Sequence, residues 1–70
     1  MPIVARIREY CAKKNLSVRE FEIKCGLYNG SVGKWERGEA FPTVVSLIKI
    51  ERGTGVKLST WLKGYQEWEI

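Results

Sequence analysis

The side chains of this 70-residue sequence that could do covalent, metal or acid-base chemistry are two cysteines and eight glutamates, with no histidine. Cys11 and Cys25 lack the spacing of a metal site. No glutamate stands beside a nucleophile and a base in a recognisable catalytic arrangement. We therefore expect no enzyme, metal, cofactor or small-molecule substrate, and we interpret both cysteines as small buried hydrophobic residues rather than a disulfide.

The charge of the chain favours a polyanionic partner. Twelve lysines and arginines against eight glutamates give a formal net charge of +4 and a pI of about 9.3. Many proteins without a nucleic-acid role are this basic, so the charge supports such a partner without identifying it. The sequence has neither an apolar run long enough to span a membrane nor a signal peptide. We expect a single cytoplasmic domain over residues 1–70, with its core in 3–63 and a C-terminal tail at 64–70.

The most informative segment is 17–38, which is typical of two short helices hinged on a glycine. Ser17 is a good N-cap, and Glu20 three residues later completes a capping box. Gly26 can take the left-handed conformation that ends a helix. The second helix is expected from near Asn29 to residue 36 or 37. Such a pair predicts a helix-turn-helix, whose second helix fits the major groove of DNA.

Three further helices are expected around this pair, at about residues 3–14, 44–52 and 58–63. Apolar residues at helical spacing mark their inward faces and those of the central pair. The residues expected in the core include Ile3, Ile7, Cys11, Phe21, Cys25, Val32, Trp35, Val44, Leu47, Ile48, Ile50, Val56, Trp61 and Leu62. Five short helices with tight connections predict an all-α, five-helix orthogonal bundle.

Residues along nearly the whole chain also fall at the spacing of a known family. They are Leu16-Ser17, Glu20-Phe21, Gly26-Leu27, Val32, Lys34 to Gly38, Pro42, Leu47 to Ile50, Gly55-Val56 and Trp61-Leu62. In these positions the chain resembles the phage-repressor-like helix-turn-helix family, also called the Cro/C1 or XRE type. The resemblance implies a lambda-repressor-like bundle and a transcriptional regulator, typically a repressor of a phage, prophage or mobile element. In such a protein the third helix lies in the major groove of double-stranded operator DNA.

The resemblance also implies which residues face the DNA. They are Ser17, Arg19, Tyr28, Asn29, Gly30, Ser31, Lys34 and Arg37. Asn29 could bond adenine through two hydrogen bonds, or could serve only as the N-cap of its helix. Lys34 could reach a guanine or a phosphate. Ser17, Arg19, Tyr28 and Arg37 would contact the DNA backbone and set the register.

Several positions depart from the family pattern. Val18 stands where members commonly carry a glutamine that bonds the DNA backbone. Glu22 and Glu51 replace the usual alanine, and we expect such a glutamate to emerge at the rim of the core or to pair with an arginine. Cys11 stands where many members have an arginine that forms an ion pair with the equivalent of Glu36. Arg8, one turn earlier, is the candidate replacement.

Two features leave alternatives open. The third helix carries few long side chains, because Gly30 and Gly33 fall within or beside it. The tail contains Tyr65, Trp68 and Ile70, which could form a homodimer contact or fold back on the core. An alternative function is therefore a protein-interaction module on the same fold, such as an antitoxin-like or antirepressor-like partner.

Overall fold

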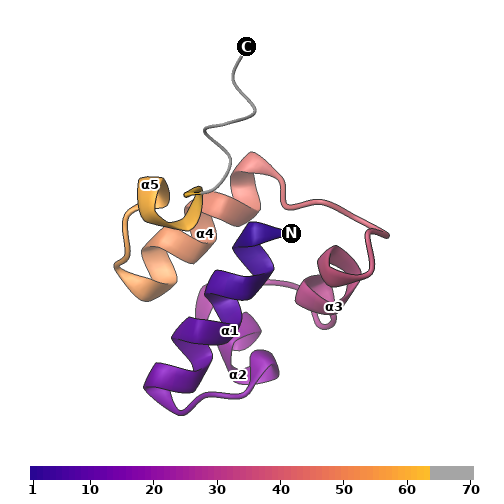
Figure 1. Ribbon diagram of the computed structural model, residues 1–70. Coiled ribbons are helices and arrows are strands. Elements are labelled where there is room, and N and C mark those ends of the chain that lie inside the picture. Colours follow the sequence, from indigo (N-terminus) through magenta and orange to yellow (C-terminus); the bar gives the residue numbers. More distant parts are fainter. Residues whose placement is uncertain (64–70) are drawn as a thin grey trace.

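The computed structural model describes residues 1–63, and this part of the chain is all-helical, as predicted (Figure 1). The helices are α1 (Pro2–Lys14), α2 (Val18–Cys25), α3 (Ser31–Glu36), α4 (Val44–Thr54) and α5 (Leu58–Trp61). α2 packs on α1, α3 and α4, while α5 packs on α4. In Figure 1, α3 and α5 lie on opposite sides of α1. The predicted homodimer contact of the tail lies in 64–70, outside the described residues.

Local hydrogen bonds set the beginnings and ends of the helices. The predicted capping box is present, because Glu20 N–H donates to Ser17 Oγ (3.0 Å) while Ser17 N–H donates to Glu20 Oε1 (2.8 Å). Thr43 Oγ1 caps α4 by accepting from Ser46 N–H at 3.1 Å. Gly26 ends α2 with a φ of 74°, a left-handed conformation that glycine adopts without steric cost. Each of these caps connects residues no more than a few positions apart.

An aromatic cluster joins α1, α2 and α5. The rings of Tyr10, Phe21 and Trp61 contact one another there, with centroids 5.7 to 6.1 Å apart. The other buried residues of the core are Ile3, Val4, Ile7, Cys11, Cys25, Leu27, Val32, Trp35 and Ile50. Both cysteines are free and buried, as predicted. The bundle therefore has one apolar core to which all five helices contribute.

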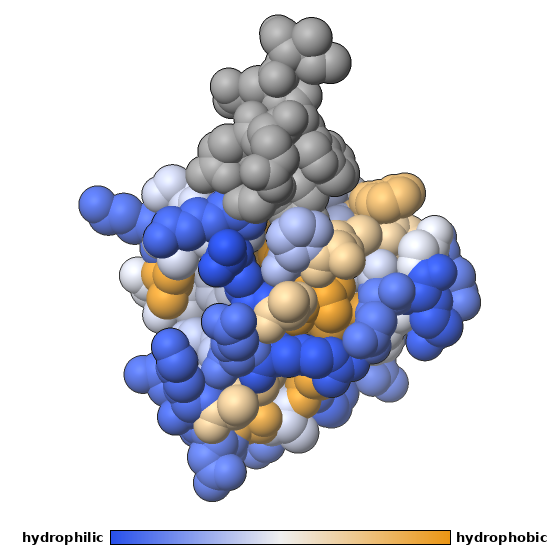
Figure 2. Space-filling view, in the orientation of Figure 1, coloured by the Kyte–Doolittle hydropathy of each residue, from blue (hydrophilic) through white to orange (hydrophobic). Residues whose placement is uncertain are grey.

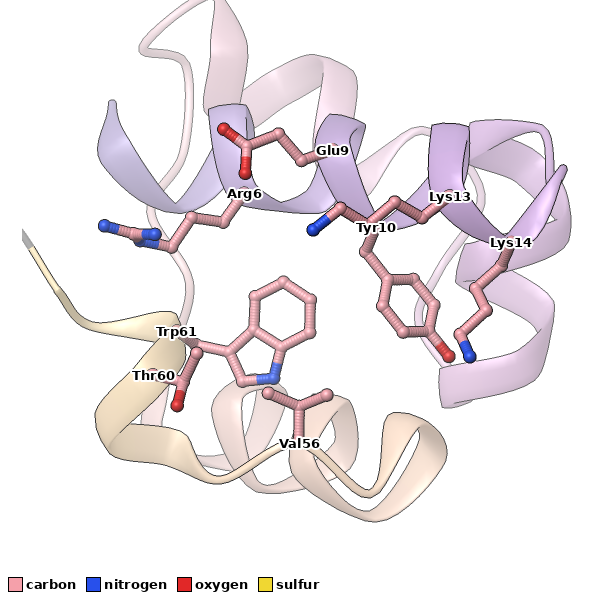
Figure 3. A pocket seen from close by; sticks show the side chains of 8 residues that line it. All are labelled: Arg6, Glu9, Tyr10, Lys13, Lys14, Val56, Thr60 and Trp61. Carbon is pink, nitrogen blue, oxygen red and sulfur yellow. The ribbon is translucent and has the colours of Figure 1, made fainter.

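A hollow of about 280 Å³ lies between α1 and the segment that leads into α5 (Figure 3). Arg6, Tyr10 and Lys13 line it from α1, with Val56 and Trp61 on the other side. Within residues 1–63 the Trp61 Nε1–H group is buried and has no hydrogen-bond partner. None of the residues predicted to face DNA lines this hollow.

The expected burial of α4 was partly wrong. Val44 and Ile48 are 71% and 41% exposed, whereas Ile50 is fully buried. Ile48 is two residues from Ile50, so it points about 160° away from Ile50 around the helix axis, to the opposite side of α4. Val44 lies in the first turn, about 9 Å along the axis from Ile50 and about 120° around it, so it faces away from the buried side of the helix. The result is an apolar surface at the start of α4. Leu62, also expected in the core, is half-buried.

Candidate nucleic-acid interface

The helix predicted to face DNA, α3, has only six residues and cannot be stable on its own. Its inward side is fixed in the core by Val32, which is fully buried, and by Trp35, which is 4% exposed. Polar contacts from two other helices hold its two ends. The position of α3 therefore depends on tertiary contacts rather than on helix propensity.

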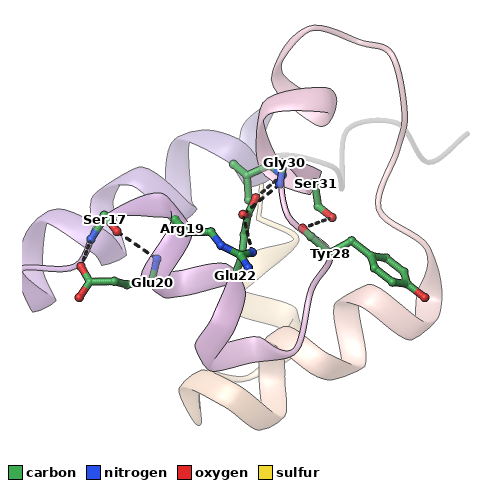
Figure 4. Close-up of polar contacts among 8 residues, drawn as sticks. Ser17, Arg19, Glu20, Glu22, Tyr28, Gly30 and Ser31 are labelled. Carbon is green, nitrogen blue, oxygen red and sulfur yellow. Dashed lines mark hydrogen bonds and ion pairs between the residues drawn. The ribbon is translucent and has the colours of Figure 1, made fainter.

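The carboxylate of Glu22, on α2, holds the beginning of α3 (Figure 4). Gly30 N–H donates to Glu22 Oε1 at 3.1 Å, and Val32 N–H donates to Oε2 at 3.0 Å. Arg19 Nη1 lies 3.5 Å from Oε1 and forms an ion pair with it. Glu22 is only 2% exposed, and a buried carboxylate is tolerated where it is paired and hydrogen-bonded in this way. Of the two alternatives expected for a glutamate at this position, the rim of the core or a pair with an arginine, the second is observed.

The other end of α3 is tied to α1 by the ion pair of Arg8 with Glu36. Arg8 Nε donates to Glu36 Oε2 at 3.2 Å, and its Nη2 donates to the second carboxylate oxygen. This hydrogen bonding lowers the pKa of Glu36. The predicted replacement of the missing arginine by Arg8 is thus confirmed. Glu51 holds α5 as Glu22 holds α3, because its Oε2 accepts from Leu58 N–H at 2.8 Å.

The turn between α2 and α3 shows that Asn29 is not the N-cap of α3. The N-cap is Gly30, with a φ of 84°, and no side chain of its own caps the helix. The Glu22 carboxylate provides the acceptor that a capping side chain would otherwise supply. Asn29 is exposed, so its amide is free of that structural task. Ser31 Oγ donates to Tyr28 O at 2.8 Å and closes the turn.

Tyr28 is the most exposed aromatic residue of the described chain, at 85%. Lys49 Nζ, from α4, lies 5.9 Å from the centroid of its ring, within the range of a cation–π contact. The same ammonium donates to Gly26 O at 3.3 Å. Lys49 was not among the residues predicted to face DNA, so sequence reasoning missed its position beside the turn. No local signal could have shown it, because Lys49 and Gly26 are 23 residues apart.

The remaining predicted residues differ in how free their polar groups are. Lys34 is exposed and forms no ion pair with any residue in 1–63. Arg37 is paired with Glu39 through Nε and Oε2 at 2.7 Å, and this hydrogen bond lowers the pKa of Glu39. Ser17 uses its oxygen and its N–H within the capping box, which leaves its hydroxyl hydrogen to donate. Lys34 therefore carries the least encumbered charge on α3.

The predicted residues lie at different places along the helix-turn-helix. Arg19 and Gly30 contact the Glu22 carboxylate, and Ser31 and Tyr28 close the turn beside it, with the Tyr28 ring pointing away from Glu22 (Figure 4). Arg37 lies at the far end of α3. The described residues hold no cluster of three or more side chains suited to a metal ion. On the face drawn in Figure 2, apolar atoms form small areas between hydrophilic side chains. The arrangement offers amide, hydroxyl and cationic groups, which suit an anionic partner with polar edges.

Comparison with known proteins also identifies a helix-turn-helix in this chain. A helix-turn-helix family model matches residues 7–61, which is more than half of the chain and includes every residue predicted to face DNA. Comparisons with curated proteins and with solved structures gave no match. In the described part of the chain, no helix is both long and apolar enough to cross a membrane.

Proposed function

The chain belongs to the Cro/C1-type, XRE-like helix-turn-helix family of DNA-binding regulators, and we propose that it is a sequence-specific repressor that places α3 in the major groove. The observation that carries the proposal is that a six-residue helix is held in the core and at both ends while Lys34 and the preceding Asn29 stay exposed. Such a rigid, polar helix is what base reading requires. Catalysis and cofactors have no part in this function.

Within this proposal the exposed residues have distinct roles. Asn29 reads an adenine edge, since its amide caps no helix, and Lys34 binds a guanine or a phosphate. Ser17, Arg19 and Tyr28 contact the DNA backbone. Lys49 joins them as a fourth backbone contact, because its ammonium lies beside Tyr28. Arg37 contributes less than its charge suggests, because Glu39 neutralises it.

We also propose a homodimer on a pseudo-palindromic operator of phage, prophage or mobile-element type, acting in the cytoplasm by occluding a promoter. A single module buries only about 600–1,000 Å² on DNA, so paired half-sites would raise affinity substantially. The tail at 64–70, with its aromatic residues, is one candidate for the dimer contact.

Selection from a random duplex library tests this function. The expected result is an enriched sequence with two-fold symmetry, bound with a logarithmic salt slope of about −0.9 for each phosphate contact. The symmetry of the enriched sites also reports the spacing of the half-sites. Absence of any enriched sequence, together with absence of salt-dependent binding to any duplex, would contradict the proposal.

A second candidate function is favoured by the apolar surface at the start of α4. Phe41, Val44, Val45 and Ile48 are between 41% and 71% exposed, and exposed apolar groups of this kind are typical of protein-interaction sites. An antitoxin-like or antirepressor-like partner could bind there. Val45→Lys combined with Ile48→Lys separates the two functions. Loss of a protein partner with duplex binding retained favours the second function, and unchanged partner binding excludes this surface.

A further inference from the structure

Glu22 fills the place that an anion would take at the start of α3. Its two oxygens accept from Gly30 N–H and Val32 N–H, so neither amide is available to a DNA phosphate. These two amides are therefore not among the groups with which α3 meets a partner. The distance between α2 and the first turn of α3 is set by these two bonds, which are 3.1 and 3.0 Å long.

The same carboxylate orients Arg19. One nitrogen of the guanidinium, Nη1, lies 3.5 Å from Glu22 Oε1, while half of the Arg19 side chain remains exposed. A guanidinium has five N–H donors in a planar fork, so most of them stay free when one edge faces a carboxylate. The ion pair restricts the rotation of a long side chain that would otherwise lose conformational freedom on binding.

We propose that Glu22 and Arg19 act as one positioning unit for DNA binding, which rests on the function proposed above. The buried carboxylate fixes α3 relative to α2, and it holds the Arg19 guanidinium in the orientation in which it binds a backbone phosphate. Glu22 is thus a positioning residue that touches no DNA. Its negative charge, which by electrostatics alone opposes DNA binding, is needed for tight binding.

Glu22→Gln and Arg19→Gln, singly and together, test this unit. Glutamine preserves the shape of Glu22 but cannot accept both amide hydrogens and a guanidinium as a carboxylate does. Glu51→Gln is the matched control, because it removes the same charge from a carboxylate that caps a helix away from α3. Each variant is first shown to be folded by circular dichroism and by its urea midpoint. Duplex affinity and salt slope are then measured on the selected operator.

The expected result separates positioning from simple charge. Glu22→Gln weakens duplex binding about tenfold although the net charge becomes more positive, while Glu51→Gln leaves binding unchanged or slightly tighter. Arg19→Gln reduces the salt slope by about 0.9, and Glu22→Gln reduces it in the same direction. In the double variant, the fold-loss of duplex affinity is smaller than the product of the fold-losses in the two single variants. Binding by Glu22→Gln as tight as by Glu51→Gln would overturn the proposal, and independent effects of the two substitutions would overturn the role of Arg19.

Amide hydrogen exchange provides a readout that does not depend on DNA. Glu22→Gln is expected to speed exchange at Gly30 and Val32 but not at Leu58, and Glu51→Gln is expected to do the reverse. Unchanged exchange at Gly30 and Val32 would overturn the positioning of α3 by Glu22. A wild-type protein that bound no duplex would overturn the proposed function and the phosphate contact of Arg19, while the exchange data would still decide how α3 is held.

Discussion

Gly53 is a point of close approach between α4 and α2, so its replacement by alanine is a sharp test of the fold. A Cβ atom at this position would lie 2.8 Å from both Cα and Sγ of Cys25 and 3.1 Å from Lys24 O. Two of these three atoms belong to the backbone and cannot rotate away. Alanine at Gly53 would therefore force α2 and α4 apart. This separation would weaken the packing that supports the helix-turn-helix.

The expected change in the free energy of unfolding follows from two opposing effects. Overpacking a well-filled contact costs about 1–3 kcal/mol, and the backbone clash places this site near the upper end. Alanine is favoured over glycine within a helix by about 1 kcal/mol. The expected net loss is about 1–2 kcal/mol, from a total stability of about 4–10 kcal/mol for a domain of this size. With a urea m-value of about 1 kcal/mol/M, the unfolding midpoint should fall by about 1–2 M.

Two other glycines provide matched controls for the Gly53→Ala measurement. At Gly33 in α3, a Cβ would meet only the end of the Arg37 side chain, with Nη1 at 3.2 Å. Gly33→Ala should therefore raise stability by up to about 1 kcal/mol. At Gly55, nothing lies within 4 Å, but φ is +72°, so alanine should cost about 1–2 kcal/mol through backbone strain alone. If Gly53→Ala were as stable as Gly33→Ala, the close packing of α2 on α4 would be wrong.

Two further predictions concern titration. The pKa values of Glu20, Glu36 and Glu39 are lowered by hydrogen bonds from backbone or arginine N–H groups, so the unfolded chain binds protons more readily. The stabilisation of the fold by these three carboxylates is complete above their unfolded pKa of about 4.3 and is lost as the pH falls through their lower folded pKa values. The urea midpoint should therefore drop between pH 5 and about pH 3. A constant midpoint over this range would contradict these contacts. Burial raises the pKa values of Cys11 and Cys25, so a thiol reagent should modify both slowly in the native protein and rapidly in urea. Fast native modification of either thiol would show that its side chain is exposed.

The parts of the fold that could be predicted from the sequence depend on contacts over a few residues. The capping box of Ser17 and Glu20 joins positions three apart, and Gly26 ends its helix through its own backbone conformation. The partner of Glu36 could be predicted because a family pattern indicated that an arginine was missing. These signals place α2 and α3 along the chain to within two residues.

The rest depends on how the helices meet, which local patterns do not specify. Glu22 caps a helix that begins nine residues later, and the choice between that carboxylate and Asn29 as the cap is a matter of tertiary geometry. Lys49 approaches the turn from another helix. Val44 and Ile48 were placed in the core because hydrophobicity shows what can be buried, not how many sides of α4 the rest of the chain covers.

The central claim, that α3 contacts DNA through Lys34, is tested most directly by charge reversal. Lys34→Glu is compared with Lys57→Glu, which changes the net charge equally at the start of α5, on the other side of α1 from α3. Operator affinity should fall by about ten- to a hundredfold for Lys34→Glu, as expected for a lost base or phosphate contact, and by no more than about threefold for Lys57→Glu. Equal losses in the two variants, or unchanged binding by Lys34→Glu, would contradict the claim.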